Sequence, residues 1–174
     1  MKEKCFELLF HAVFARQPPT REESTPKKEQ RDVVAGTQPG AQRKLSPNVL
    51  AFARRHDITA EQLNKVFMLE HDPLLPIYKI PTGNTSKGQM FKVMMVLLEN
   101  GLLNNQLSAP YSELRDNLKE DGLFDGNFNK LLKKNHSLFK GAVTKDTIKE
   151  AENVELTGAG LARLAEVIEE LAQS

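Results

Sequence analysis

The sequence has little of what a disulfide-bonded or membrane-spanning protein needs. Its single cysteine, Cys5, has no second thiol for an internal disulfide, which favours a reducing, cytoplasmic compartment. No apolar run approaches the roughly 18–20 residues that span a bilayer, so we expect no membrane association. We expect no signal peptide, because Glu3 and Glu7 occupy the place of a basic leader and His11 interrupts the apolar stretch.

The chain also lacks a strong charge of either sign. The formal net charge is +1, which argues against a protein that coats nucleic acid indiscriminately. The charge is unevenly spread, however. Residues 1–56 carry 11 Lys and Arg against 6 Asp and Glu, whereas residues 57–174 carry 13 against 17. This distribution leaves room for a local basic face.

Patterns typical of catalysis are missing as well. The histidines are scattered, and none lies three to five residues from another histidine or from Cys5, as metal ligands often do. No nucleophile elbow or dinucleotide-binding glycine loop is present. The glycine-flanked loop 83–88 is followed by Gln89-Met90 instead of the Lys-Ser/Thr of a phosphate loop, so Thr85 or Ser86 is expected only to cap a helix. We therefore expect no enzyme, no bound metal and no cofactor.

What is present divides the chain into three parts. Residues 1–45 form a predicted N-terminal amphipathic helix, with an aromatic stripe within residues 3–15, and a flexible linker rich in proline and polar residues. Residues 46–84 are expected to hold a helix-turn-helix-like pair and a short strand at residues 77–80. Residues 85–174 are the expected main domain.

Capping residues mark the two helices of the pair. Ser46-Pro47 is typical of a helix start, and that helix should end near His56. Thr59 and Gln62 have the spacing of a capping box, which opens the second helix. The outward residues of the second helix carry no net positive charge, so we interpret it as a packing element.

The main domain begins with a helix that is apolar on nearly every side. Residues 90–98 are almost entirely apolar, and Asn100-Gly101 is the expected end of the helix. Such a helix must lie at the centre of a fold. Further elements are predicted along the chain: a helix from about 111 to 122, a helix at 127–135, extended segments at 138–143 and 154–156, and a final helix capped by Thr157. The predicted fold class is mainly α with a small β-sheet.

The segment 127–135 is amphipathic in a distinctive way. At 3.6 residues per turn one side collects mainly apolar residues: Phe128, Leu131, Leu132 and Asn135. The other side collects amide and ammonium groups: Asn127, Lys130, Lys133 and Lys134. This division predicts a helix that packs on a small core and leaves an outer face free for a polyanion.

The order of these elements resembles the winged helix-turn-helix domain. The resemblance covers about residues 86–172. It is carried by Tyr-Ser-Glu-Leu at 111–114, Gly-Asn-Phe-Asn-Lys-Leu-Leu-Lys-Lys at 126–134 and Val-Glu-Leu-Thr-Gly-Ala-Gly at 154–160. It implies a winged-helix-like body in which residues 127–135 are the recognition helix and enter the major groove of DNA. Asparagine can then pair with adenine, and lysine with guanine or phosphate.

The resemblance therefore implies a non-catalytic, transcription-regulator-like protein that binds double-stranded DNA. The expected contact residues are Asn127, Asn129, Lys130, Lys133, Lys134, Lys140 and Lys145. The region 144–153 is longer than a tight wing and lacks arginine, which is a departure from the pattern. Residues 125–150 hold six lysines against three acidic residues, so a monomer should bind weakly. A homodimer formed through the N-terminal or terminal helix would double the contacts.

A second interpretation is a winged-helix-like adaptor that binds another protein and no nucleic acid. The C-terminal segment is rich in acidic residues, which would repel a phosphate backbone: Glu150, Glu152, Glu155, Glu166, Glu169 and Glu170. In this interpretation the aromatic N-terminal helix and its linker recruit the partner. The sequence identifies neither the DNA sequence nor the partner.

Overall fold

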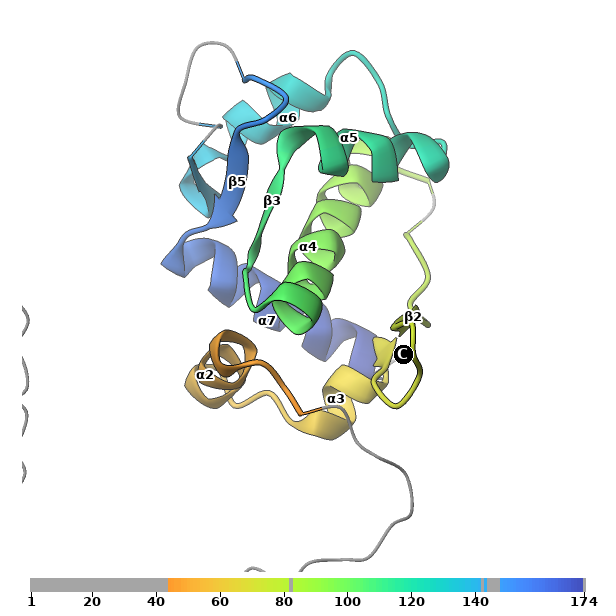
Figure 1. The fold of residues 1–174 in the computed structure, drawn as a ribbon. Helices are drawn as coiled ribbons and strands as arrows, with labels where there is room; N and C mark the ends of the chain where they lie inside the picture. Colours follow the sequence, from red (N-terminus) through yellow and green to blue (C-terminus); the bar gives the residue numbers. More distant parts are fainter. Residues whose placement is uncertain (1–43, 82, 142, 144–147, 174) are drawn as a thin grey trace, which may run out of the picture. The chain divides into compact units, whose positions relative to one another are not determined.

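A computed structural model describes residues 44–81, 83–141, 143 and 148–173. The predicted N-terminal helix and nearly all of its linker lie outside the described residues, as does Lys145. The described part is mainly helical and carries two small antiparallel sheets, which confirms the predicted fold class (Figure 1).

The helices and strands alternate along the chain. The described helices are α2 (Pro47–Arg55), α3 (Ala60–Asn64), α4 (Thr85–Asn104), α5 (Tyr111–Glu120), α6 (Phe128–Lys134), the short 3-10 helix η1 (His136–Leu138) and α7 (Gly158–Gln173). The described strands are β1 (Phe67–Met68), β2 (Leu75–Pro76), β3 (Ser108–Pro110), β4 (Phe139–Gly141) and β5 (Asn153–Leu156). None of the described helices combines the length and apolar composition needed to cross a bilayer.

Helix α4 lies at the centre, as its composition predicts. In Figure 1 it runs between α5 and α6 at one end and α2 and α3 at the other, with α7 behind it. Its consecutive residues 93–98 are all buried. Asn84, not Thr85 or Ser86, caps its start by accepting a hydrogen bond from the Lys87 N–H at 3.0 Å.

The prediction that α4 ends at Asn100-Gly101 is wrong, because Gly101 serves packing and not termination. The helix continues to Asn104, and Asn105 supplies the left-handed cap at φ 57°. A Cβ atom on Gly101 would lie 2.5 Å from Leu107 Cδ2 and 2.9 Å from Val49 Cγ2. Glycine therefore permits α2 and the segment after α4 to approach the helix closely.

The two short helices before α4 belong to the same core. Thr59 and Gln62 form the predicted capping box, with hydrogen bonds of 2.8 and 3.2 Å between each side chain and the other residue's backbone N–H. Helix α2 contacts α4, and α3 contacts α7. The Ser46 hydroxyl donates to the Gly101 carbonyl at 2.5 Å and does not cap α2. Residues 46–84 and 85–174 thus share one hydrophobic core.

The short strand before α4 lies two residues earlier than predicted. Leu75 and Pro76 pair with β1, while residues 77–80 form no strand. The reason is packing: the Tyr78 ring lies edge-on between Phe67 and Phe91, with centroid distances of 5.6 and 5.5 Å. Because the Tyr78 side chain packs into the core, the segment around it does not continue the strand.

The second sheet has three antiparallel strands in the order β3-β5-β4. The extended segments predicted after residue 138 form β4 and β5, which pair with Lys140 opposite Glu155. Strand β3 was not predicted, because three residues ending in Pro110 show no alternation. The order of elements is therefore α4, β3, α5, α6, β4, β5 and α7.

Helix α7 closes the core and begins at its predicted cap. The Thr157 hydroxyl accepts from the Gly160 N–H at 3.1 Å and donates to the Ser137 carbonyl at 2.6 Å. The buried side of α7 carries Leu164, Ala165, Val167 and Ile168. The end of the chain is thereby fixed to the segment that follows α6.

The close approach at Gly101 gives a stability test. Gly101→Ala is expected to lower the free energy of unfolding by about 1–3 kcal/mol, because overpacking outweighs the better helix propensity of alanine. Gly158→Ala is the matched control. Gly158 lies in α7, and no atom is within 4 Å of a Cβ added there, so this variant should be as stable as the unmodified protein or slightly more stable. Urea unfolding of both variants measures the difference. Equal stabilities would contradict the packing role of Gly101.

Candidate functional site

Helix α6 is held on the core by two buried side chains one turn apart. Phe128 and Leu132 are buried, and the Phe128 ring stacks on Tyr111 of α5 at a centroid distance of 5.8 Å and an interplanar angle of 14°. Phe124, in the turn before α6, meets the same ring edge-on at 6.1 Å. Aromatic contacts of this kind fix the rotation of the helix about its axis.

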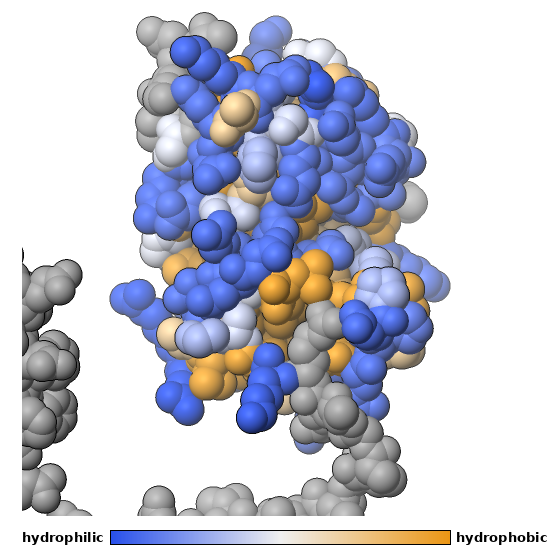
Figure 2. All heavy atoms as spheres, in the orientation of Figure 1, coloured by the Kyte–Doolittle hydropathy of each residue, from blue (hydrophilic) through white to orange (hydrophobic). Residues whose placement is uncertain are grey.

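That rotation leaves the predicted polar face outward. The exposed residues are Asn127, Asn129, Lys130, Lys133 and Lys134. The surface over α5 and α6 is mostly hydrophilic in Figure 2, whereas hydrophobic residues gather where α2, the end of α4 and β2 lie. The α6 face, meaning these five residues, is the candidate site.

The side chain of Asn129 is positioned by a contact with α5. The Tyr111 hydroxyl donates a hydrogen bond to Asn129 Oδ1. Burial raises the pKa of Tyr111 above its usual value, so the hydroxyl remains a donor at neutral pH. A contact between Asn129 and a base would therefore share an oxygen that already accepts one hydrogen bond.

The turn before α6 is tied to α4 by Gln89, a residue that sequence reasoning missed as part of the site. The Gln89 side chain is 1% exposed, and its Nε2 donates to the Leu123 carbonyl at 2.8 Å and to Asp125 Oδ1 at 3.1 Å. The same Asp125 oxygen accepts from the Asn127 N–H at 2.9 Å. In the sequence, the signal for this role was a polar residue within the apolar run of α4. Through these hydrogen bonds, Gln89 sets where α6 begins.

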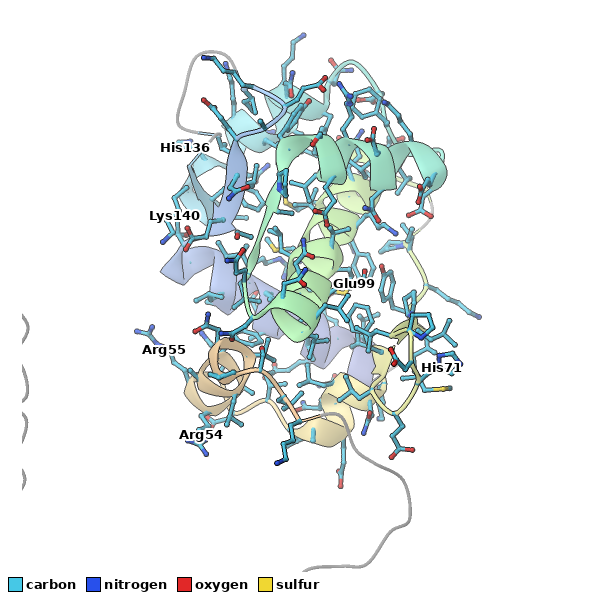
Figure 3. All side chains as sticks on the ribbon, in the orientation of Figure 1. Arg54, Arg55, His71, Glu99, His136 and Lys140 are labelled. Carbon is cyan, nitrogen blue, oxygen red and sulfur yellow. The ribbon has the colours of Figure 1, made fainter. Side chains whose placement is uncertain are left out.

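The two lysines predicted beyond α6 differ from those on the helix. Lys140 is exposed on β4 (Figure 3), but its Nζ lies 2.7 Å from Glu155 Oε1 on the neighbouring strand. Its charge is therefore partly offset within the sheet. Lys145 lies outside the described residues.

A further cation, on α5, is paired with an acidic group. Arg115 of α5 forms an ion pair with Glu150, and this hydrogen bond raises the pKa of Arg115. This ion pair offsets the charge of Arg115, which was not among the predicted contact residues. The lysines of α6 supply the exposed positive charge of the candidate site.

The described residues offer no cluster for metal chemistry. No group of three or more His, Cys, Asp or Glu side chains able to hold a metal occurs within residues 44–173 where the structure describes them. No family model, curated protein or solved structure matches this chain. The geometry of the chain itself therefore carries the functional argument.

The Gln89 tether gives a test of how α6 is positioned. Gln89→Met keeps the side-chain length but leaves the Leu123 carbonyl and Asp125 without their donor, so unfolding free energy should fall by about 1–3 kcal/mol. Gln106→Met is the matched control at an exposed position after α4 and should change stability by less than about 0.5 kcal/mol.

Amide hydrogen exchange of the same variants reports whether the turn before α6 is still held in place. The Asn127 amide should exchange faster in Gln89→Met, because its acceptor Asp125 loses its anchor on α4. Unchanged exchange at Asn127, or equal stability of the two variants, would show that Gln89 does not hold the turn.

Proposed function

We propose that this protein is a non-catalytic, transcription-regulator-like DNA-binding protein of winged-helix type. In this proposal α6 enters the major groove of double-stranded DNA. An α-helix with its side chains is about 10–12 Å across, which suits a groove about 12 Å wide. In this arrangement the lysines of α6 contact phosphates or guanine, and Asn127 and Asn129 contact base edges.

The observation that carries the proposal is the α6 face. Three lysines and two asparagines are exposed on a helix whose other side is fixed to the core through Phe128 and Leu132. Lysine neutralises phosphate, and asparagine offers the donor and acceptor pair that adenine matches. A rigidly held face with these side chains suits a polyanion better than an apolar partner.

The order of elements supports the same proposal. A helix, a strand, two helices and two paired strands follow one another, with β5 between β3 and β4 in the sheet. Apart from β3, which was not predicted, this is the order on which the resemblance to winged helix-turn-helix domains is based. The second helix of the pair, α6, occupies the place of the recognition helix.

The charge balance favours weak binding by one chain. Lys140 and Arg115 are both paired with carboxylates, so they add little to the phosphate contacts of the α6 lysines. Non-specific affinity of such a surface is on the order of 10⁻⁴–10⁻⁶ M at physiological salt. A second copy would double the contacts and raise this affinity.

A salt titration with duplex DNA tests the proposal. Binding should weaken as salt rises, and Lys130→Glu with Lys134→Glu should lower affinity and reduce the slope of log K against log salt by about 2. The matched control is Arg54→Glu with Arg55→Glu, an equal charge change at exposed residues of α2 that point away from the core (Figure 3). Fluorescence anisotropy measures both.

Two results would contradict DNA binding by α6. One is no detectable binding to duplex DNA at low salt. The other is an equal loss in the α2 control pair, which would attribute the effect to net charge and not to the α6 face.

A homodimer is the expected assembly, and the described residues limit how it forms. The apolar side of α7 is buried in the core, and its exposed side carries Glu166, Glu169 and Glu170. The aromatic stripe within residues 3–15 is therefore the better candidate for contact between copies. Light scattering on the full chain and on residues 46–174 should give a dimer and a monomer, respectively. A dimer from residues 46–174 would assign the contact to the described residues.

The adaptor function keeps one specific observation in its favour. Met68 and Leu75 lie opposite each other in the β1–β2 pair, and both are 43% exposed, as is the adjacent Ile77. Neighbouring exposed apolar side chains are typical of a surface that a partner covers. The absence of DNA binding at low salt would favour this function.

A further inference from the structure

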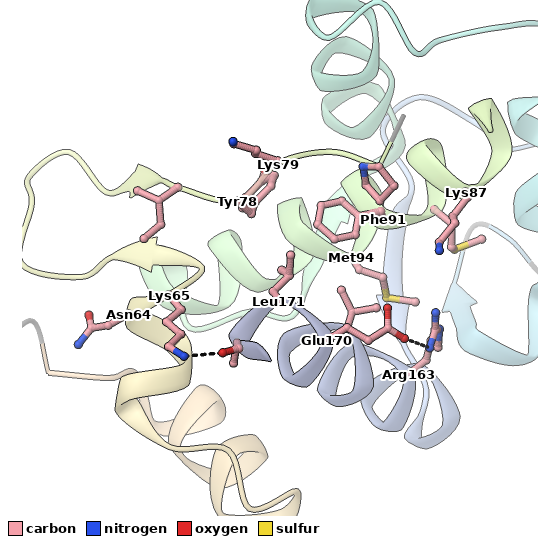
Figure 4. Close-up of a pocket in the computed structure, with 15 residues that line it drawn as sticks. Asn64, Lys65, Tyr78, Lys79, Lys87, Phe91, Met94, Arg163, Glu170 and Leu171 are labelled. Carbon is pink, nitrogen blue, oxygen red and sulfur yellow. Dashed lines mark hydrogen bonds and ion pairs between the residues drawn. The ribbon is translucent and has the colours of Figure 1, made fainter. Parts of the chain in front are cut away.

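A pocket of about 740 Å³ lies on the side of α4 between α3, α7 and the segment that precedes α4. Residues at helical spacing on α4 and on α7 form two of its walls, and residues 77–81 form a third. Asn64, the last residue of α3, and Lys65, which follows it, close one end. Figure 4 shows this arrangement, with Lys65 hydrogen-bonded to the Ala172 carbonyl near the end of α7.

The length of the pocket follows from the residues of α7 that line it. They run from Arg163 to Ala172, which corresponds to about 13 Å along a helix at 1.5 Å per residue. The volume lies within the range of roughly 300–1,000 Å³ that is usual for small-molecule sites. A ligand of moderate size fits these dimensions better than a folded partner.

The walls of the pocket are mostly apolar. Its apolar lining consists of Ile77, Tyr78, Pro81, Met90, Phe91, Met94, Val167 and Leu171. The Tyr78 ring is fixed edge-on against Phe91, so this wall is preformed. Methionines adapt their shape to an apolar ligand more easily than branched side chains do.

Two cationic side chains lie at the end of the pocket opposite Lys65. Figure 4 shows Lys87 of α4 and Arg163 of α7 at this end. Arg163 forms ion pairs with Glu166 at 2.7 Å and with Glu170 at 3.5 Å, so its charge is partly offset. Within the part of the chain that the structure describes, Lys87 has no ion-pair partner.

Lys87 is also placed against local helix preference. It lies in the first turn of α4, which contains no acidic residue, and a helix start disfavours a cation. The four cations that line the pocket face a single lining carboxylate, Glu170. An anionic group on a ligand would complement this surplus of positive charge, and the apolar walls would take the rest of the ligand.

We propose that this pocket binds a small anionic amphiphile, with its apolar body along α4 and α7 and its anionic group beside Lys87 and Arg163. The proposal does not depend on DNA binding by α6. It assigns to Lys87 the role of direct ligand contact. It assigns to Met90 and Met94 the role of apolar lining.

Binding of octanoate, with octan-1-ol as the uncharged comparison, tests the proposal on the full chain. Isothermal titration calorimetry should give octanoate about tenfold higher affinity than octanol, which is the strength of a charge-assisted hydrogen bond. Nuclear magnetic resonance of methyl-labelled methionine locates the ligand. The Met90 and Met94 methyl groups should shift, whereas Met68, on β1, and Met95, buried outside the lining, should not.

Matched variants separate the anionic contact from general apolar binding. Lys87→Gln should weaken octanoate about tenfold and leave octanol unchanged, while Lys130→Gln on α6 should alter neither. Leu171→Asn should weaken both ligands, because it places an amide in the apolar wall.

Three results would overturn the proposal. The first is equal affinity for octanoate and octanol. The second is an unchanged octanoate preference in Lys87→Gln. The third is a set of methyl shifts that includes Met68 and Met95 to the same extent as Met90 and Met94, which indicates unspecific adsorption.

Discussion

Helix α4 constrains the rest of the described unit, because a helix with apolar side chains on nearly every side must be covered on every side. The elements before and after it in the chain provide this cover: α2, β3, α5 and α6 all contact α4. Gly101 lets α2 come close, and Tyr78 folds the preceding segment onto Phe91. The small sheet and the terminal helix complete the cover. A single core therefore spans residues that the sequence divides into two parts.

The same helix also positions both surfaces for which we propose ligands. Gln89 faces the turn before α6 and fixes Asp125, whereas Lys87, Met90 and Phe91 face the pocket beside α7. Residues that are neighbours in the sequence thus serve different sides of the molecule, because each step along a helix turns by about 100°. The α6 face is polar and exposed, which suits a polyanion. The pocket is apolar and closed at one end by α3, which suits a smaller ligand.

Local signals in the sequence predicted the elements whose formation is local. The capping box at Thr59, the cap at Thr157 and the apolar and polar sides of the segment 127–135 all depend on residues a few positions apart. What the sequence did not reveal depends on distant contacts. Gly101 was interpreted as a helix end because its approach to Val49 is a tertiary fact, and the roles of Gln89 and of the Lys140–Glu155 pair depend on partners 15 to 36 positions away. The pocket combines residues from both predicted parts and has no motif of its own.

The short strands beside β5 have a consequence for how copies of this protein meet in a crowded solution. Strands β3 and β4 form the two edges of the three-stranded sheet, and each is only three residues long. Strand β3 ends in Pro110, which has no N–H to donate. Edges this short offer too few backbone groups to recruit a strand from a neighbouring molecule, and natural proteins use such edges to avoid fibre growth. The short edges of this sheet therefore disfavour self-association by strand addition.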